Sequence, residues 1–307
     1  MQALPGRTLF LPAWCVLFLS TATAPAAAQG QGEPMVVAAR WLADSLKDPR
    51  LVVLHVGDRA DYDAGHIPGA RFIDLQEVSS PRGEGLTLQL PSPGQLQSAF
   101  ESKGISDSSR IILYVAGERL TAASRVYFSL DYLGFGRQTS ILDGGLRAWK
   151  QEGRPVTPEA PEVTPGTLHP KLRPEVVATV SWLSSNLENP GLVLVDARTA
   201  EFYQGTSAGR MPRAGHIPGA VNIPYTVLTD ETGRFRSREA LRAVFANAGV
   251  RPGTQLVAYC HIGLQASLLY FAARYLDYEA RLFDGSFEEW SARPDLPVAT
   301  VPPPDRH

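Results

Sequence analysis

The chain has 307 residues, and at roughly 150 residues per domain this length predicts two domains. Lysine and arginine together number 29 against 31 aspartates and glutamates, without a basic run, which excludes a protein that binds nucleic-acid phosphates through charge. Only two cysteines are present, which excludes a disulfide scaffold, and 44% hydrophobic with 20% charged residues excludes a disordered chain.

Residues 1–28 have the pattern of a secretory signal peptide. Arg7 supplies a positive charge, residues 9–19 are mostly apolar, and the alanines at 26–28 fit a small-x-small cleavage site. The apolar run is about half of the roughly 20 residues that a membrane span needs, so an uncleaved anchor is the second choice. We therefore expect a periplasmic or secreted protein. Cleavage would remove Arg7 and Cys15, change the formal net charge from −2 to −3 and leave Cys260 as the one cysteine.

The rest of the chain runs twice through the same order of predicted elements. Its strands are short β-branched runs without strict alternation, as in strands that are covered on both faces. The fold class is therefore α/β, with two tandem domains that each contain a mostly parallel sheet flanked by helices. In chain order, we expect a helix over 36–47 and 179–186, a strand over 51–56 and 192–197, a short strand over 71–73 and 221–223, a helix over 94–103 and 238–248, a strand over 110–115 and 255–259, and a helix over 122–133 and 266–276.

A domain duplication explains this repetition. Residues 64–70 and 214–220 both read Ala-Gly-His-Ile-Pro-Gly-Ala, and the turn at 143–145 parallels the turn at 284–286. A period this long indicates duplicated domains, because solenoid repeats run over about 20–50 residues. We predict a first half over 34–154, a second half over 174–301, a proline-rich extended linker over 155–173 and a tail over 302–307.

The second half carries a cysteine loop, residues 260–265, between a buried strand and a helix. Ligands of open α/β sheets bind beyond the carboxyl ends of the strands, where Cys260 is expected to lie. Backbone N–H groups can curl around the sulfur, and the following helix points its positive end at it. A thiol pKa lowered from about 8.5 to about 6.5 would make Cys260 mostly thiolate at pH 7. The alternative is a buried, inert cysteine. The N–H donors expected here are those of His261, Ile262, Gly263, Leu264 and Gln265.

The equivalent loop of the first half has no thiol. Alignment of Tyr114 with Tyr259 places Val115 opposite Cys260, and this loop is two residues longer and carries Glu118. The first half is therefore predicted to be structural, or to form one wall of a substrate cleft.

Together, the duplicated Gly-His-Ile-Pro-Gly-Ala motif, the Asp-Gly turns and a cysteine loop in the second half alone resemble the exported tandem-domain rhodanese family, the thiosulfate and 3-mercaptopyruvate sulfurtransferases. The resemblance implies that Cys260 accepts a sulfane sulfur as a persulfide from thiosulfate or a related donor and passes it to cyanide or a thiol. It also implies that the N–H groups of residues 261–265 stabilise the persulfide and that Arg198 helps to bind the donor anion. The alternatives are a 3-mercaptopyruvate sulfurtransferase and a sulfur carrier without turnover.

Several charged residues have two interpretations. Arg198 follows a strand end, where its guanidinium can bind an anionic oxygen pair or instead pair with Asp196. Arg210 and Arg213 lie in an insertion and either extend the anion site or form an exposed basic loop. His66 and His216 occur in both halves, so we expect them to fix the turn geometry. The remaining loop histidine, His261, either supplies charge or a proton to Cys260 or points to solvent.

The cysteine loop contains no lysine, arginine, serine or threonine, which departs from both branches of the family. We expect thiosulfate as the donor because His261 can be cationic. A phosphatase of related fold would need an arginine where Ala266 stands, so that function is excluded. No cofactor is expected, and Cys260 with His261 offers too few ligands for a structural zinc. The predicted protein is a monomer with no nucleic-acid partner and, after signal cleavage, no membrane contact.

Overall fold

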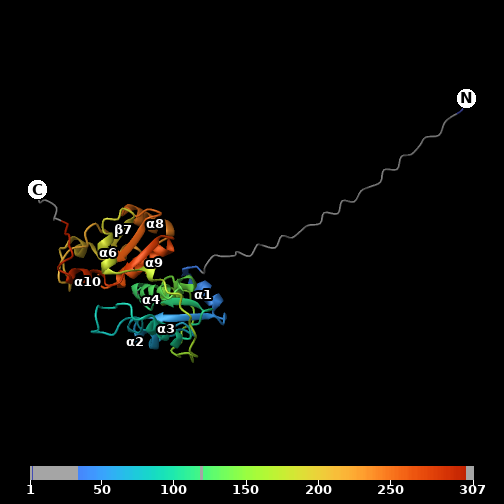
Figure 1. Cartoon of the computed structure of the whole chain (residues 1–307). Coiled ribbons are helices and arrows are strands. Elements are labelled where there is room, and N and C mark those ends of the chain that lie inside the picture. The colour runs from blue at the N-terminus through green and yellow to red at the C-terminus, as the bar shows by residue number, and fades with distance from the viewer. Residues whose placement is uncertain (1, 3–33, 118–119, 302–307) are drawn as a thin grey trace. The chain divides into compact units, whose positions relative to one another are not determined.

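A computed structural model describes residue 2 and residues 34–117 and 120–301 (Figure 1). It contains two five-stranded sheets, ordered β1-β5-β4-β2-β3 in the first half and β6-β10-β9-β7-β8 in the second, and every paired strand is parallel. The predicted α/β fold and the duplication are therefore confirmed. The predicted signal peptide over 1–28, the tail over 302–307 and Glu118 lie outside the described residues.

The predicted elements of the first half occur in the predicted order, but Val36 and Val37 form a strand where the helix over 36–47 was expected to begin. The elements of this half, including those that were not predicted, follow in chain order. They are β1 (Val36–Val37), α1 (Ala39–Ser45), β2 (Leu51–Val56), α2 (Arg59–Ala64), β3 (Arg71–Ile73), the 3₁₀ turn η1 (Leu75–Val78), α3 (Pro93–Ser102), β4 (Arg110–Tyr114), α4 (Leu120–Tyr132), η2 (Gly136–Gln138), β5 (Thr139–Leu142) and α5 (Gly145–Gln151).

The second half repeats this order. Its elements are η3 (Pro174–Val176), β6 (Val177–Ala178), α6 (Val180–Asn186), β7 (Leu192–Asp196), α7 (Ala200–Gln204), β8 (Val221–Asn222), η4 (Tyr225–Val227), α8 (Arg238–Asn247), β9 (Gln255–Tyr259), α9 (Leu264–Tyr275), β10 (Glu279–Phe283) and α10 (Ser286–Ala292).

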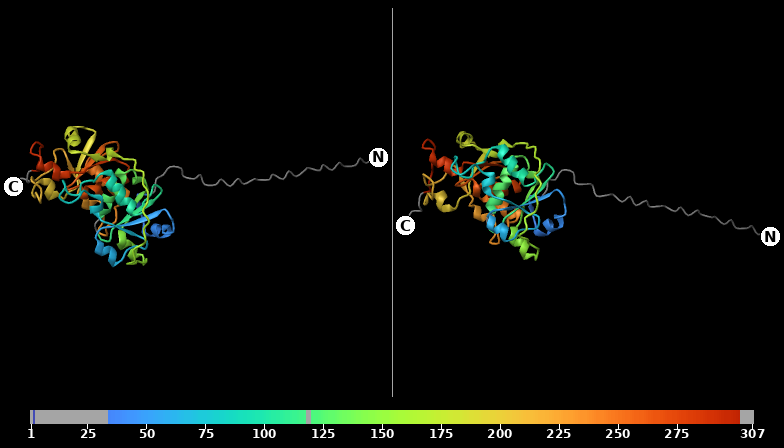
Figure 2. Two further views of the ribbon diagram at one scale, coloured as in Figure 1. Left: turned by 60° about the horizontal axis from the view of Figure 1, so that its bottom comes forward. Right: turned by 90° about the horizontal axis from the view of Figure 1, so that it is seen from below.

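Each sheet has a hydrophobic core on both faces. Figure 2 shows the ribbon of the two halves from two further directions. Alternate residues of β2 divide between the faces, with Val52 and Leu54 on one and Val53 on the other. One face of each sheet packs against its own helices, while the cores of the opposite faces merge into a single cluster. This explains why the central strands read as continuous apolar runs in the sequence.

Helices α4 and α9 join the two halves. Tyr127 meets Phe271 edge-to-face at 4.7 Å between ring centroids, and Phe128 meets Tyr270 at 5.1 Å. At the end of α4, buried Asp131 accepts a hydrogen bond of 2.5 Å from the Tyr270 hydroxyl and forms ion pairs with arginines of α9 and of the linker. The apolar character of both helices therefore follows from burial on almost every side.

The two Gly-His-Ile-Pro-Gly-Ala turns are held by matching hydrogen bonds. The tyrosine that ends the central strand of each half accepts the backbone N–H of the turn isoleucine at 3.1 Å, from Ile67 to Tyr114 and from Ile217 to Tyr259. Nδ1 of His66 lies 2.9 Å from a backbone carbonyl, and the equivalent distance for His216 is 2.7 Å. The interpretation of both histidines as turn-fixing residues is confirmed.

The linker over 155–173 forms no helix or regular strand and lies along the first half. It contributes a bridge between Thr157 and His66, a buried Leu168, and a hydrogen bond of 3.0 Å from Lys171 N–H to the Leu133 carbonyl.

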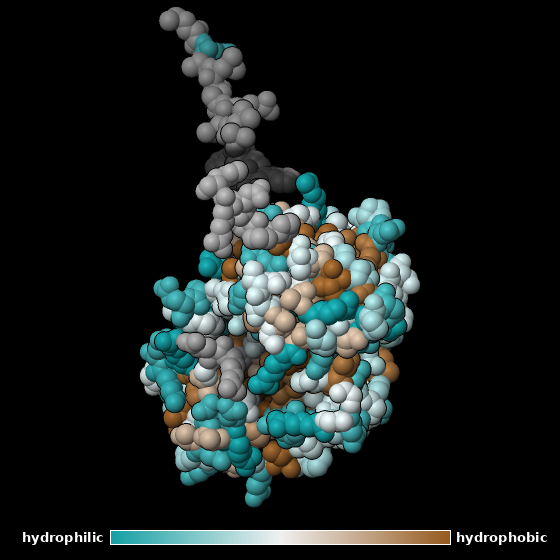
Figure 3. All heavy atoms as spheres, turned by 90° about the vertical axis from the view of Figure 1, so that its left-hand side faces the viewer, coloured by the Kyte–Doolittle hydropathy of each residue, from teal (hydrophilic) through white to brown (hydrophobic). Residues whose placement is uncertain are grey.

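Within the described residues, no helix is both long enough and apolar enough to span a bilayer. The face drawn in Figure 3 is mostly polar, with apolar residues scattered over it.

The buried imidazole of His55 predicts a loss of stability in acid. His55 is wholly buried at the end of β2, and burial lowers its pKa from 6.5 to about 4. Between these two pH values the unfolded chain binds a proton that the folded chain does not, so stability falls as the pH drops through this window. The loss should amount to about 3 kcal/mol.

Urea unfolding of the wild type and of His55→Asn at pH 7 and pH 4 tests this expectation. Between pH 7 and pH 4 the wild type should lose about 3 kcal/mol more unfolding free energy than His55→Asn, which lacks the imidazole. A difference that is the same at both pH values would contradict the assignment.

Candidate active site

Cys260 lies directly after β9, at the carboxyl end of the central strand of the second half, as predicted. Its side chain is wholly buried, and the backbone N–H groups of Ile262, Gln265 and Ala266 hydrogen-bond the sulfur. Gly263 caps α9 with φ +81°, in the left-handed region that favours glycine. Because α9 begins at Leu264, the donors at Gln265 and Ala266 belong to its first turn, where N–H groups have no partner inside the helix.

The donor set differs in part from the predicted one. Ile262 and Gln265 were expected as donors, whereas Ala266 was missed because the helix was predicted to begin at that residue. His261, Gly263 and Leu264 were also expected, but their N–H groups are not among those that act on the sulfur.

The turn over residues 284–288, here called the anchoring turn, holds the backbone of the cysteine loop. The Ser286 hydroxyl accepts the N–H of Cys260 at 3.2 Å, and the N–H of Phe287 donates to the Cys260 carbonyl at 2.9 Å. Glu288 N–H donates to the His261 carbonyl at 2.9 Å. The Asp-Gly turn of the second half therefore supports the cysteine loop.

Burial raises the pKa of the Cys260 thiol above its ordinary value, against the opposing effect of the three N–H donors. Asp196 adds a smaller contribution in the same direction as burial. The expectation of a pKa near 6.5 is therefore wrong for the protein without substrate, because the sequence shows the donors but not the loss of water around the sulfur. The resting sulfur is a protonated thiol at neutral pH.

Alkylation of Cys260 by iodoacetamide should accordingly be slow at pH 7 and should still accelerate as the pH rises above the ordinary thiol pKa of about 8.5. The reason is that only the thiolate reacts, and burial limits its formation. A Cys15→Ser background isolates the signal, and the same protein unfolded in urea gives the exposed reference. A rate that levels off below pH 8 would contradict the raised pKa.

Arg198 is buried beside Asp196. Its Nη2 lies 2.6 Å from Asp196 Oδ2, its Nε lies 3.0 Å from Oδ1, and Nη2 also donates to the Gly215 carbonyl at 2.7 Å. Burial alone would lower the pKa of Arg198, but Asp196 holds it above the ordinary value, with a smaller contribution from Cys260. Arg198 therefore has the internal partner that was the alternative interpretation, and its contact with a donor remains a prediction.

Arg198 has no equivalent in the first half. Strand pairing places His55 opposite Tyr114 and Asp196 opposite Tyr259, so Gly57 stands where the second half has Arg198. The buried cation thus accompanies the half that contains the cysteine.

His261 lies in the loop with its Nδ1 3.2 Å from Gln265 Oε1 and its ring edge-to-face with Phe202 at 4.5 Å. Burial lowers the pKa of His261 and the neighbouring Arg198 lowers it further, whereas the hydrogen bond that His261 donates to the Gln265 amide oxygen raises it. The imidazole is therefore neutral at pH 7. The expectation that His261 can be cationic, and with it the argument for thiosulfate, is not supported.

Arg213 does not extend an anion site. Its guanidinium donates to the carbonyls of Trp290, Ser291, Arg293 and Leu296 at 2.7–3.0 Å, which ties the insertion to the end of the second half. Arg210 is exposed and forms no ion pair within the described part of the chain.

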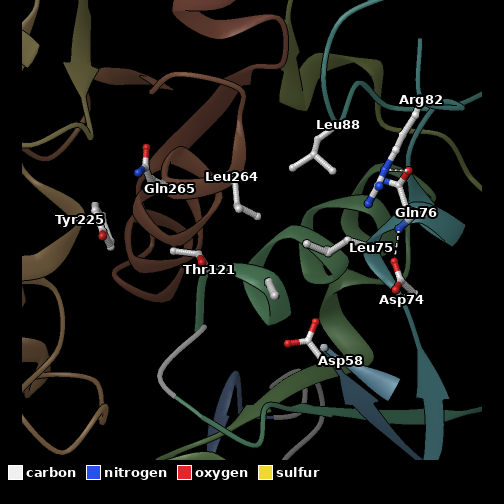
Figure 4. A pocket seen from close by; sticks show the side chains of 12 residues that line it. Asp58, Asp74, Leu75, Gln76, Arg82, Leu88, Thr121, Tyr225, Leu264 and Gln265 are labelled. Carbon is white, nitrogen blue, oxygen red and sulfur yellow. Dashed lines mark hydrogen bonds between the residues drawn. The ribbon is translucent and has the colours of Figure 1, made fainter. Parts of the chain in front are cut away.

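Two cavities flank the cysteine loop, and both have walls from each half. One of about 580 Å³ is lined by His261, Ile262, Phe202 and Arg210 and, from the first half, by Leu86 and Thr87. The other, of about 440 Å³, lies at Leu264 and Gln265 (Figure 4). Its opposite wall includes Asp74, Gln76 and Arg82, which are linked by hydrogen bonds. The first half therefore contributes a wall to both cavities, and substrate binding there remains a prediction.

Comparisons with known proteins agree with this architecture. The rhodanese-like domain family matches residues 38–152 and again residues 179–293. A probable 3-mercaptopyruvate sulfurtransferase of Pseudomonas aeruginosa is 35% identical over 279 residues, which cover 86% of this chain and 98% of the relative. The sulfur carrier protein TtuD of Thermus thermophilus is 33% identical, covering 88% and 98%. A thiosulfate sulfurtransferase of Azotobacter vinelandii is 32% identical, covering 86% and 97%.

Among solved structures, the anaerobic ergothioneine biosynthesis enzyme from Chlorobium limicola superimposes with a TM-score of 0.78 at 25% identity, covering 88% of this chain and 71% of that one. The chain belongs to the rhodanese family, with two rhodanese-like domains in tandem. It is a sulfurtransferase, which moves sulfur from a donor to an acceptor.

Proposed function

We propose that Cys260 carries the transferred sulfur as a persulfide. The observation that supports this most is the set of three N–H donors directed at the sulfur of Cys260. The first half has Val115 at the equivalent position, where no thiol chemistry is possible. A ring of N–H groups stabilises a thiolate or a persulfide anion without a basic side chain.

The reaction proceeds in two balanced steps. The Cys260 thiol first loses its proton to solvent. The thiolate then attacks the transferable sulfur of the donor (the sulfane sulfur of thiosulfate or the thiol sulfur of 3-mercaptopyruvate), a new S–S bond forms, and the bond to the leaving group breaks with its electron pair. With thiosulfate the leaving group is sulfite; with 3-mercaptopyruvate it is the enolate of pyruvate, which takes up a proton. Cyanide or a thiolate then attacks the outer sulfur, and Cys260 leaves as the thiolate.

The charges around the larger cavity favour 3-mercaptopyruvate, with one carboxylate, over the doubly charged thiosulfate. His261 is neutral, and the buried Arg198 is paired with Asp196. Among the described residues that line this cavity, Arg210 is the cation available to a single carboxylate, while the Glu288 carboxylate accepts hydrogen bonds from Thr87 and disfavours a second negative charge. Thiosulfate would bring a second negative charge that the described residues lining this cavity do not match.

Steady-state kinetics with both donors side by side, with cyanide as the acceptor, test this preference. We expect a higher kcat/KM for 3-mercaptopyruvate, and we expect Arg210→Ala to raise the KM for it about tenfold. Arg147→Ala is the matched control, because Arg147 is an exposed arginine at a cavity that adjoins Val115 rather than the cysteine loop, and it should leave the kinetics unchanged. Equal or better turnover of thiosulfate would contradict the proposed donor, and release of a single sulfur per chain would indicate a carrier.

We also propose export of a monomer after removal of residues 1–28. The support is the pattern of Arg7, an apolar run and a small-residue cleavage site. The intact mass of the protein recovered from cells should match a chain that begins near Gln29. A mass that includes Met1 would indicate an uncleaved anchor or a different location, and size-exclusion chromatography reports whether the protein is a monomer.

A further inference from the structure

Arg125 is a buried cation that the proposed reaction does not use. It projects from α4 of the first half, is wholly buried, and packs over the Phe128 ring at 5.3 Å. Its Nη2 lies 2.7 Å from Asp284 Oδ1 and also bonds the Leu88 carbonyl. Burying a guanidinium costs several kcal/mol of desolvation free energy, as an order of magnitude, so packing alone does not explain its position behind the cysteine loop.

Asp284 begins the anchoring turn that holds the backbone of Cys260 and His261. Its Oδ2 also accepts the N–H of Leu90 at 2.8 Å. At the other end of the turn, Glu288 accepts the N–H and the hydroxyl of Thr87 at 2.8 and 2.9 Å. Residues of the first half therefore bind both ends of the anchoring turn, which hydrogen-bonds the backbone of the cysteine loop.

Arg125 also reaches the loop itself. A Cβ built on Gly263 would lie 3.0 Å from the Asp284 carbonyl oxygen and 3.1 Å from Arg125 Nη1. This Nη1 has no hydrogen-bond partner among the described residues. The loop thus packs directly against the Arg125–Asp284 pair at the turn between the sulfur and the first N–H donors of α9.

The Arg125–Asp284 pair has no buried counterpart behind the first-half loop, which lacks a thiol. In the first half, Asp143 likewise accepts a cross-half N–H, from Phe235 at 3.0 Å, and lies 3.3 Å from Arg234 Nη1, but Arg234 is partly exposed. Aligning Ser124 with Ser267 puts Leu268 of α9 at the position of Arg125. A wholly buried guanidinium therefore supports the cysteine loop and has no equivalent behind the loop that contains Val115.

We propose that Arg125 is a positioning residue for sulfur transfer. Through Asp284 it fixes the anchoring turn and the cysteine loop, so that the N–H groups of Ile262, Gln265 and Ala266 stay directed at the sulfur. The first half is then part of the catalytic apparatus through this contact as well as a cavity wall. The inference rests on the proposed role of Cys260.

Two pairs of variants separate positioning from general stability. Arg125→Met removes the charge, and Arg125→Lys keeps a charge but loses the planar fork. Asp284→Asn removes the charge of the partner while an amide oxygen remains for the Leu90 N–H, and Asp143→Asn makes the same change in the first half. Each full-length variant is measured for melting temperature, for kcat and KM with 3-mercaptopyruvate and thiosulfate, and for the rate at which Cys260 gains a sulfur.

We expect Arg125→Met and Asp284→Asn to lower kcat about tenfold or more with KM nearly unchanged, because a small displacement of reacting groups costs rate more than binding. Arg125→Lys should recover part of kcat. Asp143→Asn should keep wild-type kcat, and its melting temperature should fall less than that of Asp284→Asn, because its partner Arg234 is partly exposed whereas Arg125 is wholly buried. If Arg125→Met does not fold, the two aspartate variants carry the comparison.

Wild-type kcat in Asp284→Asn, or equal losses of kcat in Asp284→Asn and Asp143→Asn, would overturn the inference. Cys260→Ser is assayed in parallel. Turnover by Cys260→Ser would refute the proposed function itself, whereas an inactive Cys260→Ser beside fully active Arg125 and Asp284 variants would refute the positioning role alone.

Discussion

Replacing Cys260 with serine should lower sulfur transfer by at least about a thousandfold and leave the melting temperature nearly unchanged. A serine hydroxyl cannot form a persulfide, but its oxygen can accept hydrogen bonds from the same N–H groups that surround the sulfur. Thiocyanate formation in the presence of cyanide measures the activity, and thermal unfolding measures the stability.

The first half offers a matched control for this substitution. Val115→Cys combined with Cys260→Ser moves the thiol to the equivalent strand end, where the loop is two residues longer than the cysteine loop. This double variant should remain inactive. Residual turnover in Cys260→Ser, or recovery of turnover in the double variant, would show that the N–H ring around Cys260 is not what enables the reaction.

Replacing Arg198 with methionine should destabilise the protein by about 3–5 kcal/mol, because Asp196 would be left buried without its counter-charge. The double variant Asp196→Asn with Arg198→Met removes both charges and should recover most of the lost stability. Urea unfolding of the two variants measures both effects.

The double variant also tests whether Arg198 binds the donor. A raised KM for 3-mercaptopyruvate in a stable double variant would support a donor contact beyond the pair with Asp196. If Arg198→Met had the same free energy of unfolding as the wild type, the buried ion pair would not be a source of stability.

The features that were predictable from the sequence are those with local signals. The duplicated motifs predicted the two halves. The apolar runs predicted the central strands, with bounds within one residue of those in the structure. Cys260 could be placed because a strand–loop–helix pattern fixes where a loop lies in a parallel sheet. The structural role of His66 and His216 followed from their presence in both halves.

Other features depend on tertiary contacts that no local pattern reveals. The helix predicted from residue 36 actually begins at Ala39, because Val36 and Val37 pair with β5 as a strand too short for its alternation to be read. The sign of the Cys260 pKa shift was wrong because burial outweighs the N–H donors. Arg213 lies far in sequence from the carbonyls that it binds, and Arg125 gave no signal because its partner Asp284 belongs to the other half.

Mass spectrometry of the protein after incubation with 3-mercaptopyruvate, and separately with thiosulfate, tests most directly whether Cys260 carries sulfur. The peptide that contains Cys260 should gain about 32 Da, the mass of one added sulfur, and should lose it on addition of cyanide. The corresponding peptide of Cys260→Ser should gain nothing. Turnover without any such gain on Cys260 would contradict a persulfide route.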